Sequence, residues 1–317
     1  MKTKLALILL SAILLAFATI QSCKKAILPP PAPVFAGDLS SFYNDYAPQS
    51  QFFTIDAGSN NEITADEGTK ITFYSNTLVD QNNQPVTGSV DVEVKEIYDK
   101  SNMLTGGIGT STTDGVILES GGMVYIHPTQ GSNTLKLTNG SFVDIKMPVK
   151  ASTPNYNMQV YYGSSSNGRV EWTAADTDST SIVIGQDSLY NNYTFYYYFN
   201  SYNFNWINTD HPPTELLSSP RTEIKAVVPA AFSNSCTGFV FFNGLNATTK
   251  FFVVDTNLSI PIQLPIGLDI TLVCFGKLDD QFFGAIQEVT VTDGMEVDLN
   301  MKAMTEKSFM SQVGALN

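Results

Sequence analysis

The sequence predicts an all-β protein, with two β-sandwich-like domains and a short C-terminal helix. Apolar and polar residues alternate with a period of two along many short segments, as they do in half-buried strands. Asn-Gly or Asp-Gly pairs separate some of these segments, and such pairs favour tight turns. Charged residues make up only 15% of the chain and hydrophobic residues 43%. A helix bundle would carry more Lys and Glu on its surface.

The length and charge of the chain limit its organisation and its partners. The 317 residues predict two domains, because a domain usually contains about 150 residues. The hydrophobic content excludes a disordered chain. The formal net charge of -13 makes nucleic acid an unfavourable partner, since phosphate groups would be repelled.

The N-terminus has the pattern of a secretory signal peptide, predicted over residues 1–22. Lys2 and Lys4 precede an apolar run, Leu5–Ile20, that is shorter than a membrane-spanning helix. The residues Ile20-Gln21-Ser22-Cys23 resemble the lipobox of bacterial lipoproteins. This resemblance implies cleavage before Cys23 and its lipidation. The alternative is an ordinary signal peptide that is followed by an unrelated cysteine.

Residues 23–37 are predicted to tether the folded part to the membrane. Lys24 and Lys25 follow Cys23, so the Asp that signals inner-membrane retention is absent and outer-membrane placement is expected. The Pro-rich stretch Leu28–Pro33 favours extended polyproline II over helix or sheet. Either the tether spaces the domain from the lipid or it is a flexible linker, and the domain could face the periplasm or the cell surface.

The first β domain is predicted over residues 38–150. Val90, Val92 and Val94 alternate with charged residues and predict a strand. A hairpin is predicted around Asn139-Gly140, between alternating runs that begin at Leu135 and end at Met147.

The second β domain is predicted over residues 220–317. Its hairpin is expected around Asp293-Gly294, between Val289 and Met301. A helix follows, with Thr305 as its N-cap and with Phe309, Val313 and Leu316 on one face.

Residues 151–219 are predicted to form an aromatic-rich β region that connects the two domains. Within it, the segment 190–206 is dense in aromatic residues, with Asn in most gaps. Tyr196, Tyr198, Tyr202 and Trp206 are therefore candidates for stacking on a glycan. The alternative is that aromatic residues are simply good strand formers whose rings fill a core.

Two cysteines remain in the folded part. Cys236 and Cys274 form either one disulfide, as an oxidising envelope compartment permits, or two separate buried thiols.

The sequence contains no motif for catalysis. His127 and His211 are the only histidines, each precedes a proline, and neither lies near a nucleophile motif. Phosphate-binding and zinc-binding motifs are absent from the sequence. We therefore expect no catalytic residue, no metal and no cofactor. A glycan hydrolase stays open as an alternative, because it would need only two facing carboxylates.

Several short segments occur in an order found in one group of proteins. They are Pro85-Val86-Thr87-Gly88, Val90-Asp91-Val92-Glu93, Leu118-Glu119-Ser120-Gly121-Gly122-Met123, Tyr161-Tyr162-Gly163, Glu171-Trp172 and Trp206-Ile207-Asn208-Thr209-Asp210. In these segments the chain resembles Bacteroidota-type envelope lipoproteins of uncharacterised function, with β-sandwich domains akin to carboxypeptidase-regulatory domains. The resemblance implies envelope placement and a β-sandwich fold, and it implies no activity.

The function expected from the sequence is therefore that of an outer-membrane or surface-anchored lipoprotein with a non-enzymatic binding or structural role. Its partners would be the membrane, through the lipid anchor, and an envelope protein or a glycan. The first alternative is a glycan-binding module that uses the segment 190–206, and the second is a glycan hydrolase.

Overall fold

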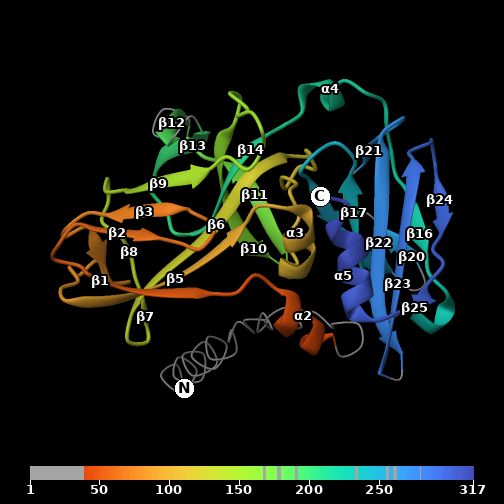
Figure 1. Ribbon diagram of the computed structural model, residues 1–317, viewed down its shortest axis with the longest axis horizontal. Helices are drawn as coiled ribbons and strands as arrows, with labels where there is room; N and C mark the ends of the chain where they lie inside the picture. Colours follow the sequence, from red (N-terminus) through yellow and green to blue (C-terminus); the bar gives the residue numbers. More distant parts are fainter. Residues whose placement is uncertain are drawn as a thin grey trace, which may run out of the picture. The chain divides into compact units, whose positions relative to one another are not determined.

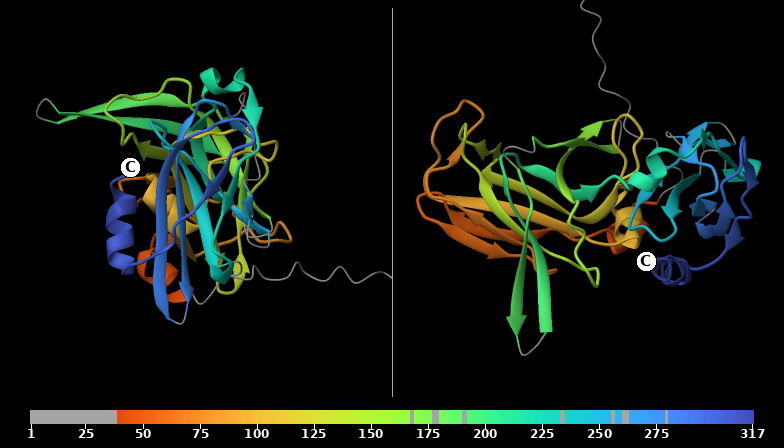
Figure 2. Two further views of the ribbon diagram at one scale, coloured as in Figure 1. Left: turned by 90° about the vertical axis from the view of Figure 1, so that its right-hand side faces the viewer. Right: turned by 90° about the horizontal axis from the view of Figure 1, so that it is seen from above.

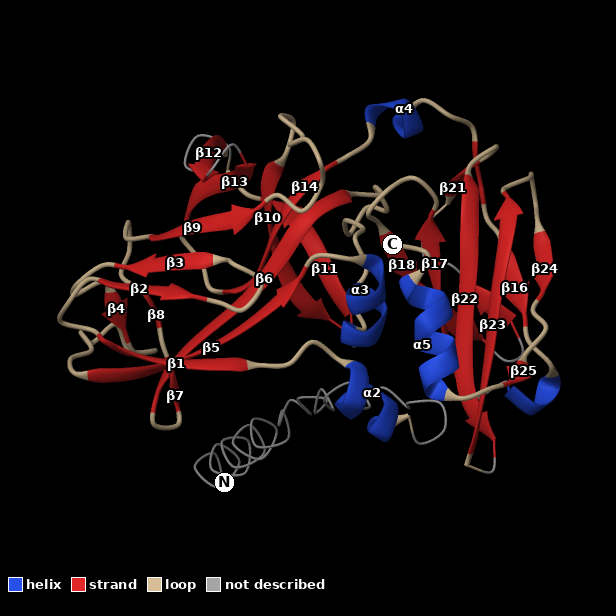
Figure 3. Ribbon diagram, viewed as in Figure 1, coloured by secondary structure: helices blue, strands red, loops and turns tan. Residues whose placement is uncertain are grey.

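A computed structural model of the chain describes residues 39–166, 169–176, 180–189, 192–232, 235–254, 257–259, 263–278 and 280–317 (Figure 1). Strands dominate these residues, which confirms the all-β, sandwich-like fold class (Figure 3). The predicted signal peptide, Cys23 and the tether lie outside the described residues. None of the described helices is long and apolar enough to cross a membrane.

Two sheets form a first sandwich. Sheet 1 contains, in spatial order, β1 (Gln51–Asp56), β5 (Ser89–Ile97), β6 (Glu119–Gln130), β14 (Asn205–His211), β10 (Gln159–Ser166) and β11 (Arg169–Ala174), with β7 (Asn133–Thr134) beside β6. Sheet 2 contains β12 (Val183–Leu189), β13 (Asn192–Ser201), β9 (Val143–Pro148), β3 (Lys70–Phe73) and β2 (Asn61–Thr64). A short pair, β4 (Leu78–Val79) and β8 (Lys136–Leu137), accompanies them.

Alternation along the strands builds the core between these two sheets. Val90, Val92 and Val94 of β5 are fully buried, as the sequence pattern predicts. They belong to the same buried cluster as Ile145 of β9 and Phe199 of β13. Sheets 1 and 2 therefore pack face to face.

Two further sheets form a second sandwich. Sheet 3 contains β19 (Phe252–Val254), β20 (Asn257–Ser259), β16 (Lys225–Val227) and β24 (Glu296–Asp298). Sheet 4 contains β18 (Thr248–Lys250), β17 (Cys236–Phe242), β22 (Asp269–Leu278), β23 (Gln281–Thr290) and β25 (Lys302–Ala303). A short pair joins β15 (Arg221–Thr222) to β21 (Leu264–Pro265).

Sheet 4 is covered on both faces. One face shares a core with sheet 3, including Leu272 of β22 and Ala226 of β16. The other face packs against α2 (Ser40–Tyr46), α3 (Lys100–Gly106) and α5 (Glu306–Gly314). This double burial explains why Ile270–Phe275 is continuously buried and apolar except for Thr271, because a strand that is covered on both sides needs no polar face.

The helices agree only partly with the sequence prediction. The C-terminal helix is confirmed: Thr305 Oγ1 accepts a hydrogen bond from the backbone N–H of Ser308 at 3.1 Å, and Phe309 and Val313 are buried. The helices α2, α3, α4 (Thr214–Leu217) and the 3-10 turn Ala230–Phe232 were not predicted. They are too short to show a clear helical period.

Both predicted hairpins are wrong in their pairing. Gly140 and Gly294 do adopt the positive φ of tight turns, 79° and 62°. However, β8 before the first turn pairs with β4, and β9 after it pairs with β3 and β13. After the second turn, β24 pairs with β16 rather than with β23. The turn residues specify a reversal of the chain, and the burial of each strand's apolar face selects its partner.

The connecting region predicted over residues 151–219 is not a separate connector. Its strands β10, β11 and β14 belong to sheet 1, and β12 and β13 belong to sheet 2. Tyr197 and Phe199 enter the core because β13 alternates between core and solvent. The segment therefore completes the first sandwich. Within the described residues, no strand pairs across residue 219.

The two sandwiches meet through backbone and side-chain hydrogen bonds. The Thr110 N–H donates to the Thr248 carbonyl at 2.7 Å, and the Thr248 N–H donates to Thr110 Oγ1 at 3.1 Å. Asn246 Nδ2 donates to the carbonyls of Tyr98 and Ser120 at 2.9 and 2.8 Å. The segment around α3 is thus bound to the second sandwich on both of its sides.

Replacing Phe309 with alanine should destabilise the protein, because its ring is fully buried against Phe42, Phe275 and Phe282. We expect a loss of about 3–5 kcal/mol in the free energy of unfolding, measured by urea denaturation. Phe52→Ala is the matched control: Phe52 is 74% exposed, so its removal should change stability by no more than about 0.5 kcal/mol. Equal effects of the two substitutions would contradict the described packing of α5.

Candidate functional site

Three of the four candidate glycan-stacking residues lie on the outer face of sheet 2 or beside it. Tyr196 and Tyr198 point to solvent because their neighbours on β13, Tyr197 and Phe199, point into the core. Tyr198 is 39% exposed, and Tyr196 and Tyr202 are half-buried. Figure 2 shows the β12–β13 hairpin projecting beyond the rest of the sheet.

Neighbouring side chains already contact the hydroxyl groups or the rings of these tyrosines. The hydroxyls of Tyr74 and Tyr198 both donate to the Asp144 carboxylate. The hydrogen bond from Tyr198, together with burial, raises the pKa of Tyr198 to about 12. The Lys146 Nζ lies 4.0 Å from the centroid of the Tyr196 ring.

The ring of Tyr202 meets the ring of Phe142 edge to face, with centroids 5.7 Å apart and planes inclined at 60°. The Tyr196 ring has an ammonium group over it, as described above. A sugar that stacks across several rings needs open ring faces with a shared orientation. Because Lys146 covers the Tyr196 ring and Phe142 contacts the Tyr202 ring, these two rings offer little open face on which a sugar could stack.

Trp206, the fourth candidate, lies in a different place. It stands on β14 of sheet 1, opposite Tyr125 of β6, with the two ring centroids 5.1 Å apart. The structure therefore separates Trp206 from the three tyrosines. Its indole lines a cavity, which we call the lysine cavity.

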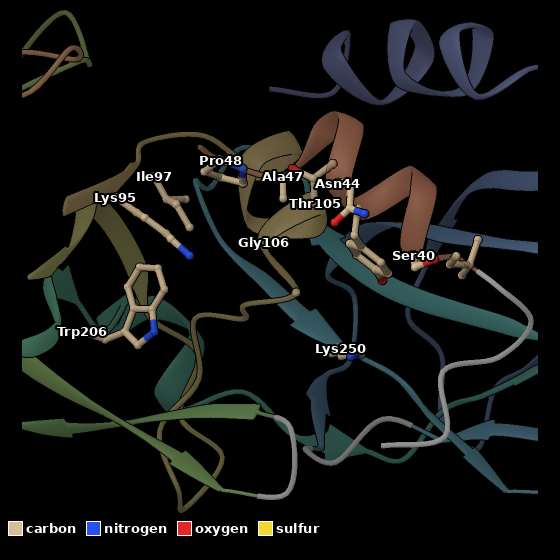
Figure 4. Close-up of a pocket in the computed structure, with 13 residues that line it drawn as sticks. Ser40, Asn44, Ala47, Pro48, Lys95, Ile97, Thr105, Gly106, Trp206 and Lys250 are labelled. Atoms are coloured by element: carbon tan, nitrogen blue, oxygen red, sulfur yellow. The ribbon is translucent and has the colours of Figure 1, made fainter. Parts of the chain in front are cut away.

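The lysine cavity has a volume of about 500 Å³. Its apolar lining includes Leu39, Tyr43, Pro48, Ile97 and Trp206, and the backbone of Gly106 and Gly107 completes one wall. Figure 4 shows Lys95, Ile97 and Trp206 on one side of the cavity and the α2 residues Ser40 and Asn44 on another. Elements from both sandwiches thus enclose it.

Two lysines supply the charge of the cavity. Lys95 comes from β5, where its Nζ lies 3.5 Å from Glu93 Oε1. Lys250 ends β18, and its ammonium has no ion pair or hydrogen bond with another described residue. Burial, and then the positive charge of Arg169, lower the pKa of Lys250. Among the described residues, no Asp or Glu lines the cavity.

Sequence reasoning missed both lysines. They are far apart in the chain and belong to different sandwiches, so no local motif joins them. The only sequence signal was compositional, because lysine is scarce in so acidic a chain.

The two cysteines do not form a disulfide in the structure. Both are buried free thiols on the neighbouring strands β17 and β22. Cys236 lies opposite Gly276 and Cys274 lies opposite Gly238, so the cysteines are diagonal neighbours in the ladder. A hydrogen bond with Cys236, together with burial, raises the pKa of Cys274.

The histidines lie apart from the cavity lining. His127 Nδ1 is 2.8 Å from the Tyr125 hydroxyl, and its Nε2 is 3.1 Å from Thr134 Oγ1. His211 ends β14. Within the described residues, no group of three His, Cys, Asp or Glu side chains could hold a metal ion.

A comparison with models of known protein families gives no match, and a comparison with curated protein sequences gives no significant relative.

Asp210 is a fully buried carboxyl next to a bulge between β14 and β6. Its Oδ2 accepts a hydrogen bond from Asn208 Nδ2 at 2.7 Å, whereas no described residue donates a hydrogen bond to its Oδ1. Burial, assisted by the negative charge of Glu119, raises the pKa of Asp210 well above its usual range. The folded state therefore favours the protonated form.

The raised pKa of Asp210 makes the stability of the folded protein depend on pH. A raised folded-state pKa contributes stability at low pH, and this contribution is lost as the pH rises through the folded-state value. Asp210→Asn should thus stabilise the protein at pH 8 by about 1–3 kcal/mol, with the advantage disappearing near pH 4. Urea denaturation at both pH values measures this, with the exposed turn variant Asp293→Asn as control. A pH-independent effect of Asp210→Asn would contradict the assignment.

Proposed function

We propose that the protein is a lipid-anchored, non-enzymatic binding protein of the outer membrane, and that the lysine cavity holds a small anionic ligand with an apolar body. The observation that carries this proposal is the ammonium of Lys250, which pairs with no other described residue and adjoins an apolar cavity with no acidic residue among its described lining.

The charge distribution supports an anionic ligand. A partly buried ammonium that has lost water and gained no partner is costly for the folded state. The lowered pKa of Lys250 expresses this cost. A carboxylate, sulfonate or phosphate in the cavity would supply the missing partner through a charge-assisted hydrogen bond. The formal charge of -13 repels anions from the chain as a whole, so a cavity lined by two lysines is a local exception where an anion can bind.

The lining supports an apolar body for the ligand. Trp206 and Tyr43 present aromatic surface, and Leu39, Pro48 and Ile97 add aliphatic surface. The volume of about 500 Å³ is within the range that encloses small organic ligands.

The composition of the lining favours binding over catalysis. The polar side chains of its described residues come from Ser, Thr, Asn, Lys and Tyr, and no His, Cys, Asp or Glu that could serve as a conventional base or nucleophile lies among them.

The glycan alternatives have less support at this site. The rings of Tyr196 and Tyr202 are occupied by Lys146 and Phe142, as described above. A hydrolase would need two carboxylates facing each other, and none lines the lysine cavity.

The anchor follows from the sequence. The lipobox-like Ile20-Gln21-Ser22-Cys23 supports lipidation of Cys23, and Lys24 supports transport to the outer membrane. The helix α2, which lines the cavity, follows directly after the tether. The domain could face either the periplasm or the cell surface, and it could contact an envelope protein there.

Lys250→Met tests the ligand-binding proposal with the fluorescent probe 8-anilinonaphthalene-1-sulfonate, an aromatic anion. The wild-type protein should bind the probe, and the variant should bind it about 10-fold to 100-fold more weakly, because a charge-assisted hydrogen bond contributes about 1.5–3 kcal/mol. The uncharged analogue N-phenyl-1-naphthylamine should lose much less affinity.

Lys302→Met, on the exposed strand β25, is the matched control and should bind both probes as the wild type does. The proposal fails if the folded wild type does not bind the anionic probe, or if Lys250→Met binds it as tightly as the wild type.

Cys23→Ala tests the anchor. It should move the protein from the membrane fraction to the soluble fraction and abolish labelling with radioactive palmitate, because several acyl chains are needed for stable anchoring. Ser22→Ala keeps a small residue before the cysteine and should remain in the membrane. Unchanged fractionation of Cys23→Ala would refute the anchor.

A further inference from the structure

A second concave site, which we call the polar groove, lies at the opposite end of α3 from the lysine cavity. It has a volume of about 870 Å³ and shares no lining residue with the cavity. Lys100 at the N-terminal end of α3 lines the groove, whereas Gly106 at the C-terminal end lines the cavity. The groove thus provides a site that the proposed function does not use.

Lys100 is the least expected residue of the groove. It is only 6% exposed, and its Nζ has no ion pair or hydrogen bond with another described residue. The nearest compensation is the ring of Phe241, whose centroid lies 5.8 Å from Nζ. Burial lowers the pKa of Lys100. Among the described residues, this buried ammonium therefore has no anionic partner.

The adjacent carboxylate, Asp99, does not act as this partner. Asp99 accepts hydrogen bonds from the backbone N–H of Asn102 at 2.8 Å, from Asn102 Nδ2 at 2.9 Å and from Ser101 Oγ at 2.6 Å. These bonds cap α3, and among the described residues Asp99 forms no ion pair with Lys100. An anion that enters the groove from outside can therefore take the place beside Lys100.

The rest of the groove offers both hydrogen-bond acceptors and hydrogen-bond donors. Glu119 and Glu288 contribute hydrogen-bond acceptors. The amide group of Asn243 accepts from Thr271 Oγ1 at 2.9 Å through its oxygen, which leaves its nitrogen as a donor. Tyr98 and Tyr197 form part of the wall. Hydroxyl groups can both donate and accept, so they suit such a surface.

We propose that the polar groove binds a saccharide that carries a carboxylate, with the carboxylate against Lys100 and the hydroxyls toward Glu119, Asn243 and Glu288. The groove's second lysine, Lys150, already pairs with Glu67 at 2.7 Å, so only Lys100 requires an anionic group from the ligand. Asp99 and the two glutamates disfavour a ligand that is anionic along its whole length. A chain with spaced carboxylates and many hydroxyls, such as a short uronic acid oligosaccharide, meets both requirements.

Lys100→Met tests this proposal by isothermal titration calorimetry with trimers of galacturonic, glucuronic and mannuronic acid. The wild type should bind at least one acidic trimer, at least about tenfold more tightly than the neutral trimer of the same hexose. Lys100→Met should remove this preference for the acidic trimer. Lys302→Met, which changes an exposed lysine, should retain it.

The unfolding temperature of Lys100→Met shows whether Lys100 contacts the saccharide directly or only supports the fold. Because the ammonium is buried without a partner, Lys100→Met should unfold at the same or a higher temperature than the wild type. Its affinity for 8-anilinonaphthalene-1-sulfonate should also be unchanged, which keeps this test independent of the lysine cavity. Loss of saccharide binding together with a lower unfolding temperature would count against a direct contact.

Three outcomes would overturn the proposal. The first is that none of the acidic trimers binds the folded wild type. The second is that Lys100→Met binds them as tightly as the wild type does. The third is that trialanine, which offers a peptide carboxylate without sugar hydroxyls, binds more tightly than every acidic saccharide.

Discussion

The burial of sheet 4 on both faces is the constraint on which the rest of the structure depends. One face completes the core with sheet 3, and the other holds α2, α3 and α5 through a cluster that includes Phe42, Leu104 and Phe309. Because α3 also follows β5 of the first sandwich, packing it on sheet 4 fixes the two sandwiches to each other. The lysine cavity and the polar groove are the spaces that remain at the two ends of this helix.

Both spaces contain a lysine that has no anionic partner among the residues that the structure describes. Evolution can retain such a group at the expense of stability when it serves a ligand, and functional sites are where this happens most often. Lys250 adjoins an apolar space and Lys100 adjoins a polar one, so the same charge would select two different classes of anion. The stability of the free protein and its affinity for ligands should therefore oppose each other at these positions.

The sequence predicted some elements well because they depend on local chemistry. The strand around Val92 and the cap at Thr305 depend on a few neighbouring residues, and both are present. The turns at Gly140 and Gly294 also form, but their flanking strands join different sheets. Of the candidate ligand residues, Trp206 alone lines the lysine cavity, whereas no local sequence motif pointed to Lys250 or Lys100.

The sequence by itself determined the β class, the turn positions and the C-terminal helix, because propensity, alternation and capping act over a few residues. Only the tertiary structure decided which strands pair, since that choice depends on burying apolar faces contributed by distant segments. It placed the strands β10, β11, β12, β13 and β14 inside the first sandwich and assembled both sites from elements far apart in the chain. The absence of a counterion beside a lysine is likewise a property of the packed neighbours, which no local pattern records.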